Sequence, residues 1–190
     1  MNEHIDWHEQ ENWRSRLETA LKANRRDAHS RYFQLATAGL DGSPQCRTVV
    51  FRGFLGDGDH LLAITDARSQ KVAEIKRDRR GQVHWYFARS REQFRLKTSM
   101  RLCDASGDQA LRTALWAKLS DAARAQFFWP DPGAPLASGD SLPVTEDPPA
   151  SFWVIDIEPR QVDYLWLGKT HQRIISQRVG SSWQERSVNP

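Results

Sequence analysis

The sequence predicts a mainly β fold: a small antiparallel barrel with helices at its ends. Apolar and polar residues alternate with a period of two in several short runs, as in half-buried strands. Turn signals rich in Gly, Asp and Pro separate these runs, as at residues 39–44 and 56–58. We count about nine strands and no internal repeat. A length of 190 residues with 39% hydrophobic content fits one domain, 1–190, with its own core.

An amphipathic helix is predicted first, over residues 7–28. Trp13, Leu17, Ala20 and Leu21 follow helical spacing and would face the core. The period then changes to two. Strands joined by short turns pair as antiparallel neighbours. A meander of three such strands is therefore expected at residues 32–37, 45–54 and 60–65.

Further helices and hairpins fill the rest of the chain. A helix over 67–77 would bury Val72 and Ile75. Two short helices follow, one opened by the capping-box spacing from Ser106 to Gln109 and one capped by Ser120. Residues 129–150 should form a loop, because six of the nine prolines fall there. The remaining strands are expected at 82–87, 92–103, 152–157, 161–167, 170–178 and near Trp183.

Composition narrows the range of partners. The net charge of +3 is modest and the basic residues are dispersed, so we expect no nucleic-acid partner. No apolar run of 18 residues or leader segment is present, and we expect no membrane span. Cys46 and Cys103 lack metal or redox spacing and should be reduced core residues, which favours a cytoplasmic location. His4 and His8 have i, i+4 spacing near the terminus, and we expect no metal site.

Two stretches indicate a phosphate site. Residues 47–52, Arg-Thr-Val-Val-Phe-Arg, read as a strand with an arginine at each end. Residues 65–71, Thr-Asp-Ala-Arg-Ser-Gln-Lys, read as a strand end that passes into a helix capped by Asp66 or Ser69. Free N–H groups at a helix N-terminus, with Thr65, Ser69, Lys71 and a facing arginine, would hold a phosphate. Alternation puts Arg47 and Arg52 on opposite faces unless a bulge intervenes.

In this order the motifs resemble those of the pyridoxamine 5'-phosphate oxidase family, from about residue 32 to the end. Residues 47–52 resemble its R-x-V-L-L-K strand, and residues 65–71 resemble T-N-x-x-S-R-K. Gln93 falls where the family carries a flavin-contacting glutamine. Residues 166–173, Trp-Leu-Gly-Lys-Thr-His-Gln-Arg, resemble W-Q-G…R-L-H-D-R. The tail from Trp183 resembles W-x-x-x-R-L-x-P, with the Arg and Leu out of step.

The resemblance implies an FMN-binding split barrel that forms a homodimer with FMN at the interface. It implies that Gln93, Trp166 and Arg173 reach a flavin whose phosphate is held by the other subunit's Arg47 and Lys71. The substrate, a small anion or an amine, would meet Lys169, His171 and Arg124. The implied cofactor-binding residues are Arg47, Thr48, Val49, Val50, Arg52, Thr65, Asp66, Ser69, Gln70, Lys71, Gln93, Trp166 and Arg173.

The departures from the family concern the substrate. Of the family's Tyr-x-x-x-Arg-x-x-x-Ser substrate-phosphate pattern only Arg124 is kept, and Phe128 stands where the Ser is expected. Lys169, His171 and Arg173 would form a cationic strip if they share one strand. Three functions remain open: an FMN-dependent oxidase that passes a substrate hydride to the flavin and then to oxygen, a flavin reductase-like protein, and a noncatalytic flavin-binding module.

Overall fold

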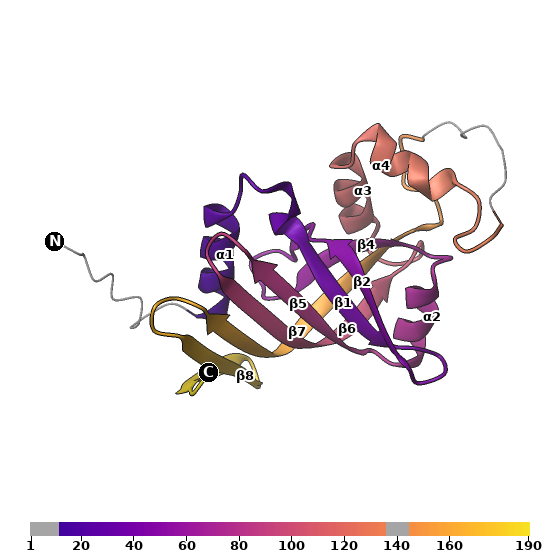
Figure 1. The fold of residues 1–190 in the computed structure, drawn as a ribbon. Coiled ribbons are helices and arrows are strands. Elements are labelled where there is room, and N and C mark those ends of the chain that lie inside the picture. Colours follow the sequence, from indigo (N-terminus) through magenta and orange to yellow (C-terminus); the bar gives the residue numbers. More distant parts are fainter. Residues whose placement is uncertain (1–11, 136–144) are drawn as a thin grey trace.

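The computed structural model describes residues 12–135 and 145–190, in which one antiparallel sheet is flanked by helices (Figure 1). The predicted mainly β architecture is confirmed. In chain order the elements are α1 (Trp13–Ala23), η1 (Ala28–Arg31), β1 (Tyr32–Ala38), β2 (Pro44–Val50), β3 (Gly53–Phe54), β4 (Leu61–Asp66), α2 (Gln70–Arg77), β5 (Arg80–Phe87), β6 (Glu92–Cys103), α3 (Gln109–Ala117), α4 (Asp121–Ala125), η2 (Gln126–Phe128), β7 (Phe152–Trp166), β8 (Gln172–Val179) and β9 (Ser182–Val188).

Strand β7 is the branch point of the sheet. The main path runs β2-β1-β5-β6-β7-β4-β3. Outside this path β8 pairs with β7, and β9 pairs with β8. The first half of β7 pairs with β4 and its second half pairs with β8, while β6 pairs along nearly all of it. The sheet therefore divides along one long strand instead of closing.

The two strands predicted at 152–157 and 161–167 are one strand, and the predicted break is wrong. Pro159 lies between them and lacks the N–H that a ladder needs. The structure accommodates it with a bulge, because Pro159 pairs with Thr98 and Gln161 pairs with Lys97, which leaves Arg160 as the extra residue. A proline that reads as a strand end is thus a bulge inside a strand.

The predicted meander is wrong in its second step. β2 ends at Val50, and the chain turns at Gly53, whose φ of 129° favours glycine. The two-residue β3 then pairs with β4, whereas β2 pairs with β1 alone. The predicted strand 45–54 is therefore two strands on opposite edges of the main path.

The helices begin and end differently from the predictions. α1 begins at Trp13, where the Asn12 side chain accepts from the Ser15 N–H, and it ends at Ala23 instead of residue 28. The predicted residues 7–11, like His4 and His8, lie outside the described residues. α3 is capped by Asp108 and not by Ser106, because Ser106 bonds back to Asp104. Ser120 caps α4 as predicted.

Two apolar clusters hold the elements together. The larger one lies between α1 and the sheet and contains an aromatic group around Trp85, whose ring centroid is 5.1 to 5.3 Å from those of Phe33, Phe51 and Phe87. The smaller one packs α3 and α4 on β4 and β7, with Trp116 5.0 Å from Phe152. Figure 1 shows α1 and α3–α4 at opposite ends of the sheet. Of the two predicted core cysteines, Cys103 is half-buried and Cys46 is exposed.

Candidate functional site

The turn between β4 and α2 brings Thr65, Ser69 and Lys71 together. The Lys71 Nζ donates to Ser69 Oγ at 3.1 Å and to Thr65 Oγ1 at 3.3 Å, and the two hydroxyl oxygens are 2.9 Å apart. Ser69 is the N-cap residue of α2, but its hydroxyl donates to the Asp66 carbonyl instead of capping the helix. Asp66 accepts from the Arg68 N–H and side chain. The predicted cluster therefore forms, and the hydrogen-bond partners of its lysine within the described residues are hydroxyl groups.

Arg47 approaches this cluster from β2, held by three anchors. Its Nη1 donates to the Leu35 carbonyl at 3.3 Å and to Thr37 Oγ1, and its Nη2 donates to Glu74 Oε2 at 2.8 Å. Glu74 is fully buried in α2, while the Arg47 side chain keeps 22% exposure. Arg47 therefore forms an ion pair with a carboxylate of the core and is not a free surface arginine.

The positive charges of this cluster are only partly balanced by carboxylates. Burial lowers the pKa of Lys71, and the neighbouring Arg47 lowers it further. The carboxylates of Asp66 and of fully buried Glu74 oppose this lowering but do not outweigh it. An anion at the Lys71 ammonium would relieve the repulsion, and phosphate fits a donor set of lysine, hydroxyls and guanidinium.

The other residues of the β2 stretch divide between the two faces of the sheet. Thr48 and Val50 point outward, whereas Val49 is buried in the larger core cluster. Arg52 lies beyond the end of β2, so the alternation argument for it does not apply. Its N–H donates to the Leu62 carbonyl, its Nε is buried without a hydrogen-bond partner in the described residues, and burial together with Arg31 lowers its pKa.

Gln93 and Arg173 lie on the outer face of the sheet, opposite the core. Gln93 Oε1 is 3.2 Å from His84 Nε2, and Arg173 makes two hydrogen bonds to Asp163, at 3.0 and 2.9 Å. Arg95 also pairs with Asp163. Burial would raise the Asp163 pKa, but the bonds and charges of the two arginines outweigh it and lower that pKa. This ion-pair ladder joins β6, β7 and β8.

Trp166, Lys169 and His171 do not join that outer face as a strip. Trp166 pairs with Glu92 and packs against the larger core cluster. β8 begins at Gln172, so exposed Lys169 and His171 belong to the connection before it, and strand alternation does not align them with Arg173. The predicted cationic strip on one strand is wrong for that reason.

Arg124 is already engaged in this structure. Its Nε donates to the Trp116 carbonyl at 3.2 Å and its Nη2 to the Ala117 carbonyl at 3.2 Å, and it lies over the Trp116 ring. It thereby satisfies carbonyls at the end of α3. Its predicted role toward a substrate stays a prediction.

Sequence reasoning missed Glu74, Thr37 and Asp163. A carboxylate one turn after Lys71 and next to buried Ile75 was the available signal for Glu74, since a charge at the edge of an apolar helix face needs a partner. Thr37 and Asp163 carried no such signal, because strand pairing across the sheet decides what they meet. Among the described residues no group of His, Cys, Asp and Glu has the arrangement of a metal site.

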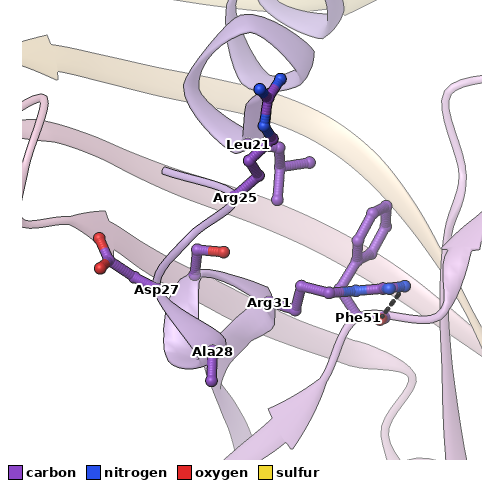
Figure 2. A pocket seen from close by; sticks show the side chains of 7 residues that line it. Leu21, Arg25, Asp27, Ala28, Arg31 and Phe51 are labelled. Atoms are coloured by element: carbon purple, nitrogen blue, oxygen red, sulfur yellow. Dashed lines mark hydrogen bonds between the residues drawn. The ribbon is translucent and has the colours of Figure 1, made fainter. Parts of the chain in front are cut away.

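A hollow of about 350 Å³ lies elsewhere, between α1, η1 and the end of β2 (Figure 2). One of its two arginines, Arg31, donates to the Phe51 carbonyl at 3.1 Å. None of the predicted cofactor or substrate residues lines it, so it is separate from the phosphate cluster. Its lining residues are Leu21, Arg25, Asp27, Ala28, Ser30, Arg31 and Phe51.

The chain is similar to known proteins along nearly its whole length. It is 38% identical over 192 residues to pyridoxine/pyridoxamine 5'-phosphate oxidase 2 of Arabidopsis thaliana, covering 94% of this chain and 96% of the relative. A solved pyridoxamine 5'-phosphate oxidase-related, FMN-binding protein from Nostoc punctiforme is 38% identical, with a TM-score of 0.89 over 96% of this chain and 100% of that one. PhzG from Burkholderia lata, at 17% identity and a TM-score of 0.76 over 92% of this chain and 89% of that one, shares the fold.

The family described as pyridoxamine 5'-phosphate oxidase, FMN-binding domain, matches residues 10–104. That segment contains β2, the β4–α2 turn and the helix that carries Lys71. In the parts of the chain that the structure describes, no helix is long and apolar enough to span a membrane. The divided sheet, the Nostoc neighbour and the matched segment agree, and this chain belongs to the pyridoxamine 5'-phosphate oxidase family of FMN-binding split-barrel proteins.

Proposed function

We propose that this protein is an FMN-dependent oxidoreductase that acts on a small anionic or amine substrate as a homodimer. The observation that carries the proposal is Lys71, a partly buried cation beside a second cation, whose hydrogen-bond partners among the described residues are hydroxyl groups. FMN supplies the redox chemistry when bound, and the chain supplies binding and orientation. Arg47, Thr65, Ser69 and Lys71 would hold its phosphate.

A second subunit completes the site in this proposal. Arg47 points to the core face of the sheet, whereas Gln93 and Arg173 lie on the outer face. Three strand spacings separate β2 from β6, roughly 14 Å. Residues divided in this way would reach one flavin more readily from two chains than from one.

The outer face offers a surface for that second copy. Tyr32 and Tyr86 are each 44% exposed, and Val50 pairs with Tyr32 across β1 and β2. No described helix packs on this part of the sheet. Aromatic residues on an uncovered face are typical of subunit interfaces. Light scattering should give twice the mass of one chain, and a monomer with bound flavin would contradict the dimer.

Heat release of the cofactor followed by mass spectrometry tests the central proposal. We expect FMN, and a protein that binds riboflavin and FMN equally would contradict the phosphate site. Oxygen uptake with pyridoxamine 5'-phosphate, compared with NAD(P)H consumption, then separates an oxidase from a flavin reductase.

A flavin reductase-like or noncatalytic flavin-binding protein is the second candidate, and the Arg124 contacts favour it. Arg124 is bound to carbonyls at the end of α3, and Phe128 stands in place of the family Ser. Few groups of the family pattern are therefore left to bind a substrate phosphate. We therefore expect slow turnover of pyridoxamine 5'-phosphate. The Tyr and Ser that this chain lacks would each give one hydrogen bond to the substrate phosphate, and losing both costs about 3–6 kcal/mol in binding. Turnover equal to that of the Arabidopsis relative, measured side by side, would contradict this expectation.

A further inference from the structure

The fully buried carboxylate of Glu74 lies one turn after Lys71 in α2. Its Oε2 accepts from Thr37 Oγ1 at 2.6 Å and from Arg47 Nη2 at 2.8 Å. Its Oε1 has no hydrogen-bond partner in the described structure. A buried ion pair adds little to stability compared with apolar packing, because both charges must leave water. The carboxylate is therefore better explained by what it does to Arg47.

The anchors leave Arg47 with donors to spare. A guanidinium has five N–H donors. Leu35 and Thr37 accept from Nη1, and Glu74 accepts from Nη2. The Nε–H and one Nη2 hydrogen have no acceptor among the described residues. These two hydrogens are free to bind a phosphate oxygen.

The anchors also oppose a repulsion. Arg47 lies close enough to Lys71 to lower its pKa, so the two cations repel each other. A long arginine side chain without anchors would swing toward solvent and away from the ammonium. Glu74 and Thr37 pull the guanidinium from the side opposite to solvent and keep it beside Lys71.

We propose that Glu74 and Thr37 are positioning residues that hold the Arg47 guanidinium in place for the phosphate of FMN. The proposal rests on the proposed function, in which Arg47 and Lys71 bind that phosphate. Neither residue contacts the flavin itself. Their effect should therefore appear only in the part of the affinity that the phosphate contributes.

The test measures the ratio of the riboflavin to the FMN dissociation constant by titration of flavin fluorescence. Glu74→Ala removes the acceptor of Arg47, and the ratio should fall about tenfold. Thr37→Val removes a neutral anchor without a change of charge, and the ratio should fall about threefold. Glu74→Gln keeps an acceptor oxygen and should retain the ratio within about threefold. Lys76→Ala, on the exposed side of α2, is the matched control and should leave the ratio unchanged.

Unchanged riboflavin affinity shows that each variant is folded, and a merely structural role would lower both affinities together. If Glu74→Ala does not fold, the ratios of Thr37→Val and Glu74→Gln test the proposal. A wild-type ratio in Thr37→Val, or a Glu74→Gln ratio as low as that of Arg47→Ala, would overturn the positioning role. Lys71→Ala shows whether the phosphate site itself or only the positioning role has failed. If it too keeps the wild-type ratio, the phosphate site itself is misplaced, whereas a lowered ratio there confines the failure to the positioning role.

Discussion

The phosphate cluster around Lys71 and the ion-pair ladder around Asp163 each place two cations near a buried carboxylate, yet they differ in what they still need. Arg173 is bound to Asp163 by two hydrogen bonds, and this contact raises its pKa. Among the described residues Lys71 donates hydrogen bonds to hydroxyl groups alone, and burial lowers its pKa although Asp66 and Glu74 oppose the shift. The charges of the ladder are paired within the chain, whereas an added anion would stabilise the cluster. Counting cations in a sequence does not separate these two cases, but their partners do.

Arg47→Ala should give the largest effect, and it is an effect on stability. The change leaves the fully buried Glu74 without its cation, which should cost about 3 kcal/mol in the free energy of unfolding. Urea denaturation of the flavin-free protein measures it. The double variant Arg47→Ala, Glu74→Gln is the control and should regain most of the stability. An Arg47→Ala protein as stable as wild type would show that the pair is not part of the core.

Lys71→Met should weaken FMN binding without weakening the fold. It removes a charge-assisted hydrogen bond worth about 1.5–3 kcal/mol, or roughly 10- to 150-fold in FMN affinity. Riboflavin affinity should not change, since riboflavin has no phosphate. Lys76→Met, on the exposed side of the same helix, is the control in fluorescence titrations. FMN affinity equal to wild type would place the phosphate elsewhere.

Arg173→Ala should have a smaller effect and a different signature. It removes one of two arginines from Asp163, and the remaining Arg95 pair limits the loss of stability to about 1 kcal/mol. If Arg173 reaches the flavin ring, the affinities for riboflavin and FMN should fall by the same factor. A fall in the affinity for FMN alone would mean that Arg173 contacts the phosphate. The cluster and the ladder would then no longer differ in function.

The smallest effect is the pH dependence, and its sign follows from Lys71. The ammonium binds phosphate, so FMN affinity should fall as the pH rises from 7 through the lowered Lys71 pKa. The unfolded chain holds this proton more tightly, so the empty protein should become more stable as the pH rises from the lowered Lys71 pKa toward the ordinary lysine pKa. Lys71→Arg, which does not titrate there, is the control. Titrations that show parallel curves for wild type and Lys71→Arg would contradict the assignment.

The sequence by itself determined the fold class, most strands and the cluster in the β4–α2 turn. Alternation marked β1, β5 and β6, because one face of each is buried. Thr65, Ser69 and Lys71 lie within seven residues of one another, so local turn and helix geometry brings them together. The family motifs are local for the same reason, and they were enough to identify an FMN-binding split barrel.

Only the tertiary structure decided which charges are satisfied. Glu74 meets Arg47, and Asp163 meets Arg173, across strands or between a helix and a strand, and no spacing along the chain encodes such pairs. The same holds for the Pro159 bulge, which needs β6 beside it, and for Gly53, which moves the chain from β2 to β3. Long-range pairing fixes these features because each buried polar group must find its partner wherever the fold places one.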